Sequence, residues 1–468
     1  MAIERLSADD RLLLLSDKRW PQDVGAVAVL DGRPLCDGSG TPLVDVAREA
    51  VAQGLDGLPR LRQVVRFPAR GLGGPFWTDA PDFRLADHVR VGPPLASDDD
   101  AALLAAVEQI RSRPLDFRRP LWELWLLPGP RTEHVALFVR MHHVVADGLA
   151  GVATLAALLH VRPGEGGRPA AAWSPAPAPS RSELMRDGVR RRGQAARGVL
   201  AALGRPRETS AAAAAVWHGI RELVIGEPGP VTSLGGLVGG HRRLALVRAP
   251  LDEVQGVAHA QHATVNDALL AVIAAGVRAL LSSRGESVDG LVVPVLVPVS
   301  LRRGTDPSHV GNRISQMAVG LPVGEADPVE RLRRISASTS RAKALPHPSL
   351  GVVFRNRLVS AVLLRLVVRR RVNLLSADLI GPAEPLAFAG APLEEVFPLV
   401  NLLGNLTLGV GAMSYAGRFE VLVVADADLH PDLDVFARGA ADELGVLAAG
   451  VGPVAASREP PGGRWPVG

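Results

Sequence analysis

Residues 135–159 read VALFVRMHHVVADGLAGVATLAALL, and this stretch predicts a strand, a turn with reactive side chains, and a helix. If the strand is regular, successive side chains point to opposite faces of a sheet. His143 then shares the apolar face of Met141, and His142 points the other way. Asp147 and Gly148 open an apolar segment that is typical of a helix.

The histidine pair is the candidate catalytic group of the chain. Imidazole is the side chain whose ordinary pKa lets it take up and return a proton near neutral pH. Asp147 lies four residues after His143, where a carboxylate can cap the helix or pair with an arginine and so fix the loop. A buried His143 on such a loop is a general-base candidate.

Two other interpretations of the pair stay open. Zinc binding is disfavoured because the two rings should point apart and no third strong ligand lies nearby in the sequence. A histidine that only packs in the core is the commoner case for an isolated residue. The Asp-Gly pair at a fixed distance is what favours catalysis here.

The composition is that of a globular protein with two or three domains, since the chain has 468 residues, 47% of them hydrophobic and 21% charged. Nucleic-acid binding is not expected, because arginines are interleaved with acidic residues and aromatic residues make up only 4%. Cys36 is the only cysteine, which excludes an intrachain disulfide and favours a reducing, cytoplasmic location. The N-terminal apolar run at residues 12–15 is too short for a signal peptide or a membrane span.

A segment rich in Pro, Ala and Gly, residues 162–180, is the clearest domain boundary. We therefore expect an N-terminal half at residues 1–160, a linker at 161–215, a C-terminal half at 216–457 and a disordered tail at 458–468. Two basic segments, residues 183–203 and 352–375, either are helices in contact with solvent and protein or lie on an anionic membrane surface.

The two halves share one sequence outline. Residues 419–448 predict a strand, an Asp-rich loop and a helix, as residues 135–159 do, but without the paired histidines. We infer two similar α/β halves, of which the first keeps the chemistry. Periodicity predicts further strands at 25–30, 61–67, 122–127, 242–247, 291–301 and 406–415, and helices at 43–52, 101–112, 183–203 and 265–281.

The motif His142-His143-Val-Val-Ala-Asp147-Gly148 resembles the HHxxxDG motif of the acyl-CoA-dependent acyltransferase superfamily, which includes chloramphenicol acetyltransferase and peptide-synthetase condensation domains. Within it, the chain resembles the bacterial wax ester synthase/diacylglycerol acyltransferase family. Further matching segments run along the chain: Pro120-Leu121-Trp122-Glu123, Asn266-Asp267, residues 298–302, Gly311-Asn312, Gly381-Pro382 and residues 414–417.

This resemblance implies an α/β fold of two chloramphenicol-acetyltransferase-like sandwich domains with an active-site tunnel at their interface. It also implies that His143 deprotonates a hydroxyl, which attacks the acyl thioester directly, with acyl-CoA as co-substrate and no metal or other cofactor. Asp147 would hold the loop, with Arg302 as its partner, and Gly148 would leave room beside the acyl chain. His142 is carried over as the second catalytic histidine. Positioning roles are carried over to Asn266, Asp267, Pro120 and Trp122.

The expected function is that of a long-chain acyl-CoA:alcohol O-acyltransferase that forms wax esters, or triacylglycerol from diacylglycerol. Two alternatives stay open: acylation of a specialised-metabolite hydroxyl from a CoA or carrier-protein donor, and a non-catalytic lipid-binding relative. The expected location is the cytoplasm, either free or peripheral on the inner membrane face or lipid droplets. Departures from the family pattern fall at Asp23, at residues 378–380 and at Gly235-Gly236, and they bear on the acceptor more than on the reaction.

Overall fold

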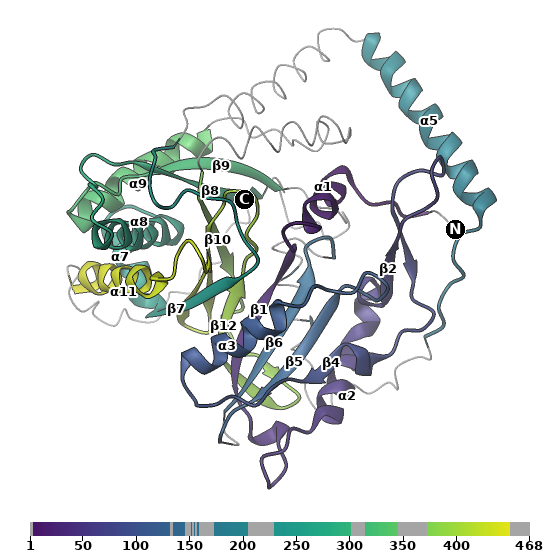
Figure 1. Cartoon of the computed structure of the whole chain (residues 1–468), viewed down its shortest axis with the longest axis horizontal. Coiled ribbons are helices and arrows are strands. Elements are labelled where there is room, and N and C mark those ends of the chain that lie inside the picture. Colours follow the sequence, from purple (N-terminus) through teal and green to yellow (C-terminus); the bar gives the residue numbers. More distant parts are fainter. Residues whose placement is uncertain are drawn as a thin grey trace, which may run out of the picture.

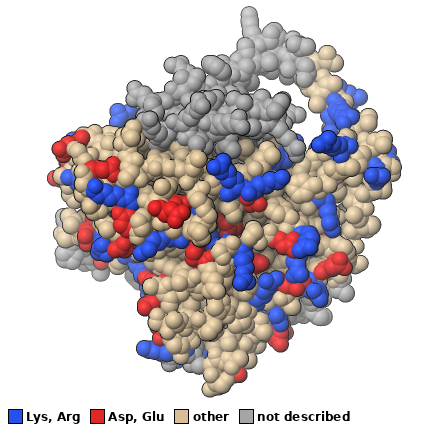
Figure 2. Space-filling model, in the orientation of Figure 1, with Lys and Arg blue, Asp and Glu red and all other residues tan. Residues whose placement is uncertain are grey.

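The computed structural model describes residues 3–131, 134–145, 151, 154, 157–158, 173–204, 229–300, 314–344 and 372–449. In this part of the chain two six-stranded sheets, each with helices packed on it, lie side by side (Figure 1). On the face shown in Figure 2, basic and acidic side chains are interspersed. The expected α/β class with two layered halves is confirmed.

The first sheet is built around the strand that carries the histidines, β6, which pairs antiparallel with β1 and β5. Both faces of β6 are buried, because Val135 and Leu137 pack into one apolar cluster and Ala136 and Phe138 into another. The strands run in the order β11 (Ala387–Phe388), β12 (Ala391–Leu399), β1 (Asp23–Asp31), β6 (His134–His142), β5 (Trp122–Pro128), β4 (Val89–Val91).

Helices cover the two faces of this sheet as their apolar spacing requires. α2 (Val44–Gly54) packs on the face of Leu137, and α3 (Asp100–Arg111) packs on the face of Phe138. Asp99 caps α3 by accepting from the Ala102 N–H at 2.8 Å. The strand expected at 61–67 is shorter, since β2 (Gln63–Arg66) follows a 3₁₀ turn and pairs with β3 (Phe76–Asp79). α1 (Ala8–Asp17) precedes β1.

The second sheet packs against a long apolar helix, α8 (Val265–Ser283). Thr264 and Asp267 form a capping box at the start of this helix. Within the described ranges α8 is the one helix long and apolar enough to cross a membrane, but it is mostly buried in this half. The strands run β7 (Arg242–Pro250), β14 (Arg418–Asp426), β13 (Leu408–Tyr415), β10 (Leu374–Ile380), β8 (Val293–Ser300), β9 (Ile314–Leu321). The other helices are α7 (Leu251–Ala260), α9 (Pro328–Ala344) and α11 (Leu433–Ala449).

The shared outline of the two halves extends to strand order and register. β6 lies between β1 and β5, and β14 lies between β7 and β13, antiparallel in all four pairings. In both halves the last residue of the central strand faces the first residue of its neighbour: His142 faces Asp23, and Asp426 faces Arg242. Asp426 is therefore the positional counterpart of His142.

The two sheets do not follow the expected boundary between the halves strictly. Within the expected C-terminal half, residues 216–457, β11 and β12 join the first sheet, where β12 pairs with β1. The physical reason is that β1 pairs with β6 along one edge only, and the hydrogen-bonding groups of its other edge pair with β12, which is distant in sequence. Residues 173–180 form neither helix nor strand, and α5 (Arg181–Leu203) follows them. The rest of the boundary at 161–215, the tail at 458–468 and most of the basic segment at 352–375 lie outside the described residues.

The two sheets meet where β12 packs against β14, and a carboxyl group lies in this contact. Glu420 of β14 is fully buried, and its Oε2 accepts from the Val396 N–H of β12. Burial raises the pKa of Glu420 to about 8, although the hydrogen bond from Val396 and the charges of Arg418 and Arg248 lower it. The side chain is therefore protonated in the folded protein at neutral pH.

Glu420→Gln should change how stability depends on pH. The folded pKa lies above the unfolded value of 4.5, so the native state holds an extra proton, and wild-type stability falls as pH rises from about 4.5 to about 8. The variant lacks this loss, so its stability relative to wild type should rise by up to about 5 kcal/mol across that window, at about 1.4 kcal/mol per pKa unit. Unfolding by urea at a series of pH values measures the gap. Glu394→Gln, an exposed neighbour on β12, is the matched control, and a gap that does not change with pH would contradict the assignment.

Candidate active site

The histidine pair lies where β6 ends and a turn begins. The backbone N–H of His142 donates to Leu121 O at 2.9 Å, and that of His143 donates to Gln22 O at 2.8 Å. The Val145 N–H then donates back to His142 O at 2.8 Å and closes the turn. Both histidines are thus fixed by the backbones of β1 and of the segment before β5.

The burial of the two rings differs from the expectation. His142 is 1% exposed, whereas His143 is only half-buried. We expected His143 to follow the apolar face inward, but the strand ends at His142, so strict alternation stops one residue earlier. His142 is the ring held inside the protein, and His143 is the more exposed of the two.

His142 is held in one tautomer by its surroundings. Its Nδ1 accepts from the Val144 N–H at 3.1 Å, so the ring proton lies on Nε2. That nitrogen lies 3.2 Å from Asp17 Oδ1, at ion-pair distance but off the line of a hydrogen bond. Phe117 packs edge-on against the ring with centroids 5.5 Å apart.

Asp17 is a site residue that sequence reasoning missed. It is the last residue of α1, where the helix dipole disfavours a negative charge. Its Oδ1 also accepts from the Gln22 N–H at 2.9 Å, so it links α1, the start of β1 and His142. The only signal in the sequence was a carboxylate at a position that is unfavourable for one.

Asp23 faces His142 across the β1–β6 ladder, so this departure from the family pattern falls inside the site. Its carboxylate lies 3.2 Å from Arg111 Nε and 3.8 Å from Arg140 Nη1. Arg140 in turn donates to Glu123 Oε2 at 3.0 and 2.8 Å. Burial opposes ionisation, but the two guanidinium groups outweigh it and hold the pKa of Asp23 below its ordinary value. The carboxylate is charged and compensated.

The Pro120-Trp122 motif lies beside the histidines. Trp122 begins β5 opposite Met141, is buried, and donates from Nε1 to Leu61 O at 2.7 Å. Pro120 and Trp122 line a cavity of about 390 Å³ together with Arg140, but neither histidine is among its lining residues. This cavity is therefore not the expected tunnel, which stays a prediction.

Asn266 and Asp267 lie in the first turn of α8. Asp267 accepts from the N–H and hydroxyl of Thr264 and, through Oδ1, from the Thr339 hydroxyl at 2.7 Å. These contacts give Asp267 a role in starting α8 and tying it to α9. The structure does not bring it into contact with the histidines.

Three predicted site residues, Asp147, Gly148 and Arg302, lie outside the described residues, and their roles stay predictions. The departure at Asp378 is on β10, where burial raises the pKa of this carboxyl to about 6. Across the described ranges, His, Cys, Asp and Glu side chains form no cluster of three that could hold a metal ion.

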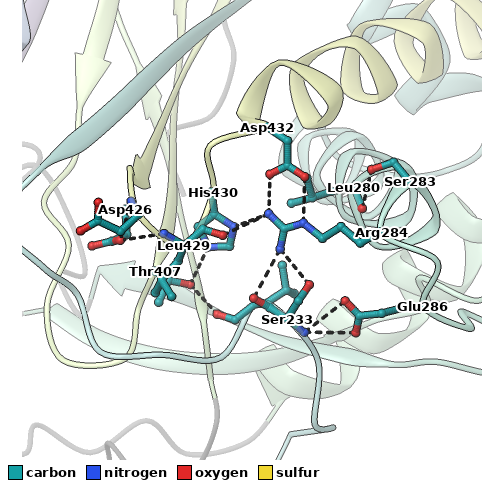
Figure 3. A network of polar contacts seen from close by, with 12 residues as sticks. Ser233, Leu280, Ser283, Arg284, Glu286, Thr407, Asp426, Leu429, His430 and Asp432 are labelled. Carbon is teal, nitrogen blue, oxygen red and sulfur yellow. Dashed lines mark hydrogen bonds and ion pairs between the residues drawn. The ribbon is translucent and has the colours of Figure 1, made fainter.

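The counterpart of the site in the second half is closed (Figure 3). Asp426 accepts from the Gly239 N–H at 2.6 Å and from the N–H groups of Asp428 and Leu429 at 3.1 Å each, so it caps the turn. His430 is fully buried, and burial lowers its pKa to about 4, so the ring is neutral.

Both nitrogens of His430 have partners. Its Nε2 lies 3.1 Å from the Thr407 hydroxyl, which donates to Leu234 O at 2.7 Å. Its Nδ1 lies 3.3 Å from Arg284 Nη2, and Arg284 also forks onto Asp432. This network links the segments around Leu234, Thr407 and His430. Because both ring nitrogens of His430 are engaged, the ring cannot act as a base toward a ligand.

Asp23→Asn should destabilise the fold by about 3 kcal/mol at pH 7, because Arg111 and Arg140 lose a buried counter-charge. The folded pKa of Asp23 is depressed, so its contribution is present above the ordinary value of 3.8 and is lost as pH falls through the folded pKa. Urea unfolding at pH 7 and in acid measures both effects. Asp31→Asn, at the other end of β1, should change little, because Asp31 is only partly buried and pairs with the exposed Arg33. Equal effects of the two substitutions would contradict the buried ion-pair assignment.

Comparison with known proteins agrees with this architecture. The chain matches the wax ester synthase/diacylglycerol acyltransferase catalytic domain over residues 6–269 and the C-terminal domain of the same family over residues 310–448. It is 30% identical over 454 residues to "Probable diacyglycerol O-acyltransferase tgs1" of Mycobacterium tuberculosis, with 92% of each chain covered.

Solved structures show the same fold. The wax ester synthase/diacylglycerol acyltransferase from Marinobacter aquaeolei VT8 aligns with a TM-score of 0.66 at 22% identity, covering 96% of this chain and 100% of that one. The first condensation domain of the calcium-dependent antibiotic synthetase aligns with a TM-score of 0.61 at 19% identity, covering 96% of both chains. The two family models together cover most of the chain and the relative aligns over nearly its full length, so the chain belongs to the wax ester synthase/diacylglycerol acyltransferase family.

Proposed function

We propose that this protein transfers a long-chain acyl group from acyl-CoA to an alcohol, forming a wax ester, or triacylglycerol when the acceptor is diacylglycerol. The observation that carries the proposal is the half-buried His143 beside the buried, tautomer-fixed His142 at the end of β6. Family membership supports acyl transfer as the reaction class.

The proposed reaction needs one base that takes up and returns one proton. The imidazole of His143 removes the proton of the acceptor hydroxyl, and the oxygen attacks the carbonyl carbon of the thioester. The C–S bond breaks, and the imidazolium returns the proton to the departing thiolate. An ester and free CoA leave, and the histidine is restored without an acyl-enzyme.

The apolar side chains packed around the histidine turn support long-chain substrates. Val144, in the histidine turn, packs in a cluster with Leu6 and Leu121, and the half-buried Leu13 and Leu14 of α1 pack against the same cluster. α1 also ends at Asp17, beside His142. An alkyl chain in contact with the partly exposed Leu13 and Leu14 would gain from leaving water, which a polar acceptor would not.

The direct test incubates the full chain with palmitoyl-CoA and either hexadecanol or dioleoylglycerol, and follows both free CoA and the ester. We expect ester formation with at least one of these acceptors. If neither is esterified while a polar polyketide or sugar hydroxyl is acylated, the long-chain proposal is wrong. Release of no CoA with any acceptor would favour a lipid-binding relative.

His143→Ala should lower kcat/KM by roughly 10²–10⁴-fold, the usual contribution of a general base. His142→Ala should lower it less, because His142 supports the turn and does not take the proton. Circular dichroism and melting temperature check that both variants fold. Small losses of the same size in both variants would contradict the assignment of His143 as the base.

Asp17→Asn should lower kcat roughly tenfold, the scale at which partners that orient functional histidines act. Because Asp17 contacts His142 and not the proposed base, the loss should fall on kcat, with KM little changed. Asp10→Asn is the matched control, since it weakens the capping box at the other end of α1 and keeps Asp17. If both variants lose activity equally, Asp17 acts only through the stability of α1.

A further inference from the structure

Helix α5 projects from the body of the protein (Figure 1). Its first turns are anchored: Leu184 and Asp187 are buried, and Asp187 pairs with Arg5 at 2.8 Å. Arg192 donates to Gly71 O at 3.3 Å. Beyond this contact, every residue of α5 whose side chain is described is exposed.

An apolar stripe runs along the face of α5 that points away from the protein. At 3.6 residues per turn, Met185, Val189 and Leu200 fall within about 60° of one another. Leu184 and Asp187, which face the body, lie on roughly the opposite side of the helix. Met185, Val189 and Leu200 are 59%, 63% and 68% exposed. Water therefore covers three large apolar side chains that folding has not buried.

A stripe of arginines runs beside the apolar stripe. On a helical wheel, Arg186, Arg190 and Arg197 lie within about 40° of one another and beside the apolar residues. The two stripes are therefore neighbours along the helix. α5 contains six arginines and two acidic residues, one of which is the buried Asp187. Figure 2 shows basic side chains gathered on this projecting helix.

Charge decides between two possible occupants of this face. A second copy of the chain would bring the same arginines against themselves in a symmetric contact, which is unfavourable. A bilayer with anionic headgroups offers phosphates to the arginines and an acyl boundary to the apolar side chains.

We propose that α5 is an interfacial helix that lies on an anionic phospholipid surface, with Met185, Val189 and Leu200 inserted and Arg186, Arg190 and Arg197 on the phosphates. This binding surface is separate from the acyl-transfer site and does not rest on the proposed function. It would hold the protein where apolar acceptors and diacylglycerol are concentrated.

Vesicle flotation of the full chain tests the proposal, with phosphatidylcholine alone or mixed with phosphatidylglycerol, at low and high salt. We expect binding to the mixed vesicles only, weaker at high salt. The triple variant Arg186→Gln/Arg190→Gln/Arg197→Gln should bind on the order of 100-fold more weakly, at about fivefold (about 1 kcal/mol) per arginine. Met185→Ser/Val189→Ser/Leu200→Ser should lose roughly tenfold or more.

A matched control removes three exposed arginines elsewhere, Arg84→Gln/Arg118→Gln/Arg438→Gln. It should keep binding, and all variants should keep the wild-type melting temperature. No flotation of the wild type at low salt, or equal losses in the control and the α5 arginine variant, would overturn the proposal. A wild-type dimer in sedimentation that the serine variant abolishes would assign the stripe to self-association instead.

Discussion

The antiparallel pairing of β1 with β6 is the constraint on which the site depends. It runs from Asp31 opposite His134 to Asp23 opposite His142, so it determines what faces the histidine. The approach is close at Gly25, where an added Cβ would lie 2.0 Å from Val139 O. A side chain at this position would push β1 away from β6 and shift both Gln22 and Asp23 relative to the histidine turn. Glycine is therefore required there by contact rather than by backbone conformation.

The same pairing makes a cluster of buried charges necessary. Once Asp23 lies inside the sheet contact, its charge has to be compensated, and α3 and β6 supply Arg111 and Arg140. Arg140 is 2% exposed and is also neutralised by Glu123, which holds the Trp125 indole as well. An arrangement of this kind adds little net stability compared with apolar packing, but the loss of any one partner is costly. It fixes geometry around His142 more than it strengthens the fold.

Local sequence patterns predicted the helices and strands, but they could not predict contacts between residues far apart in the sequence. β6, α8 and α11 follow from apolar periodicity and caps, and their bounds agree with the predictions to within a few residues. β12 could not be assigned to the first sheet, because its pairing with β1 joins residues far apart in the sequence and no local signal marks a partner. The contact between Asp17 and His142 escaped for the same reason. The prediction that His143 is buried was wrong, because it extended the alternation of side chains one residue past the end of β6.

The two halves show how the proposed catalytic turn differs from a structural turn at the equivalent position. At the end of β14, Asp426 satisfies the N–H groups of the turn, and His430 is sealed with both nitrogens engaged and a pKa near 4. A ring in that state can neither reach a substrate nor hold a proton near neutral pH. At the end of β6, the equivalent position holds a buried histidine, and the next residue, His143, stays half-exposed. In the first half, the buried residue is thus His142, one position before the proposed base His143. The proposed base therefore sits next to a fixed, buried histidine and keeps a half-exposed ring, and the β1–β6 pairing holds that buried neighbour in place.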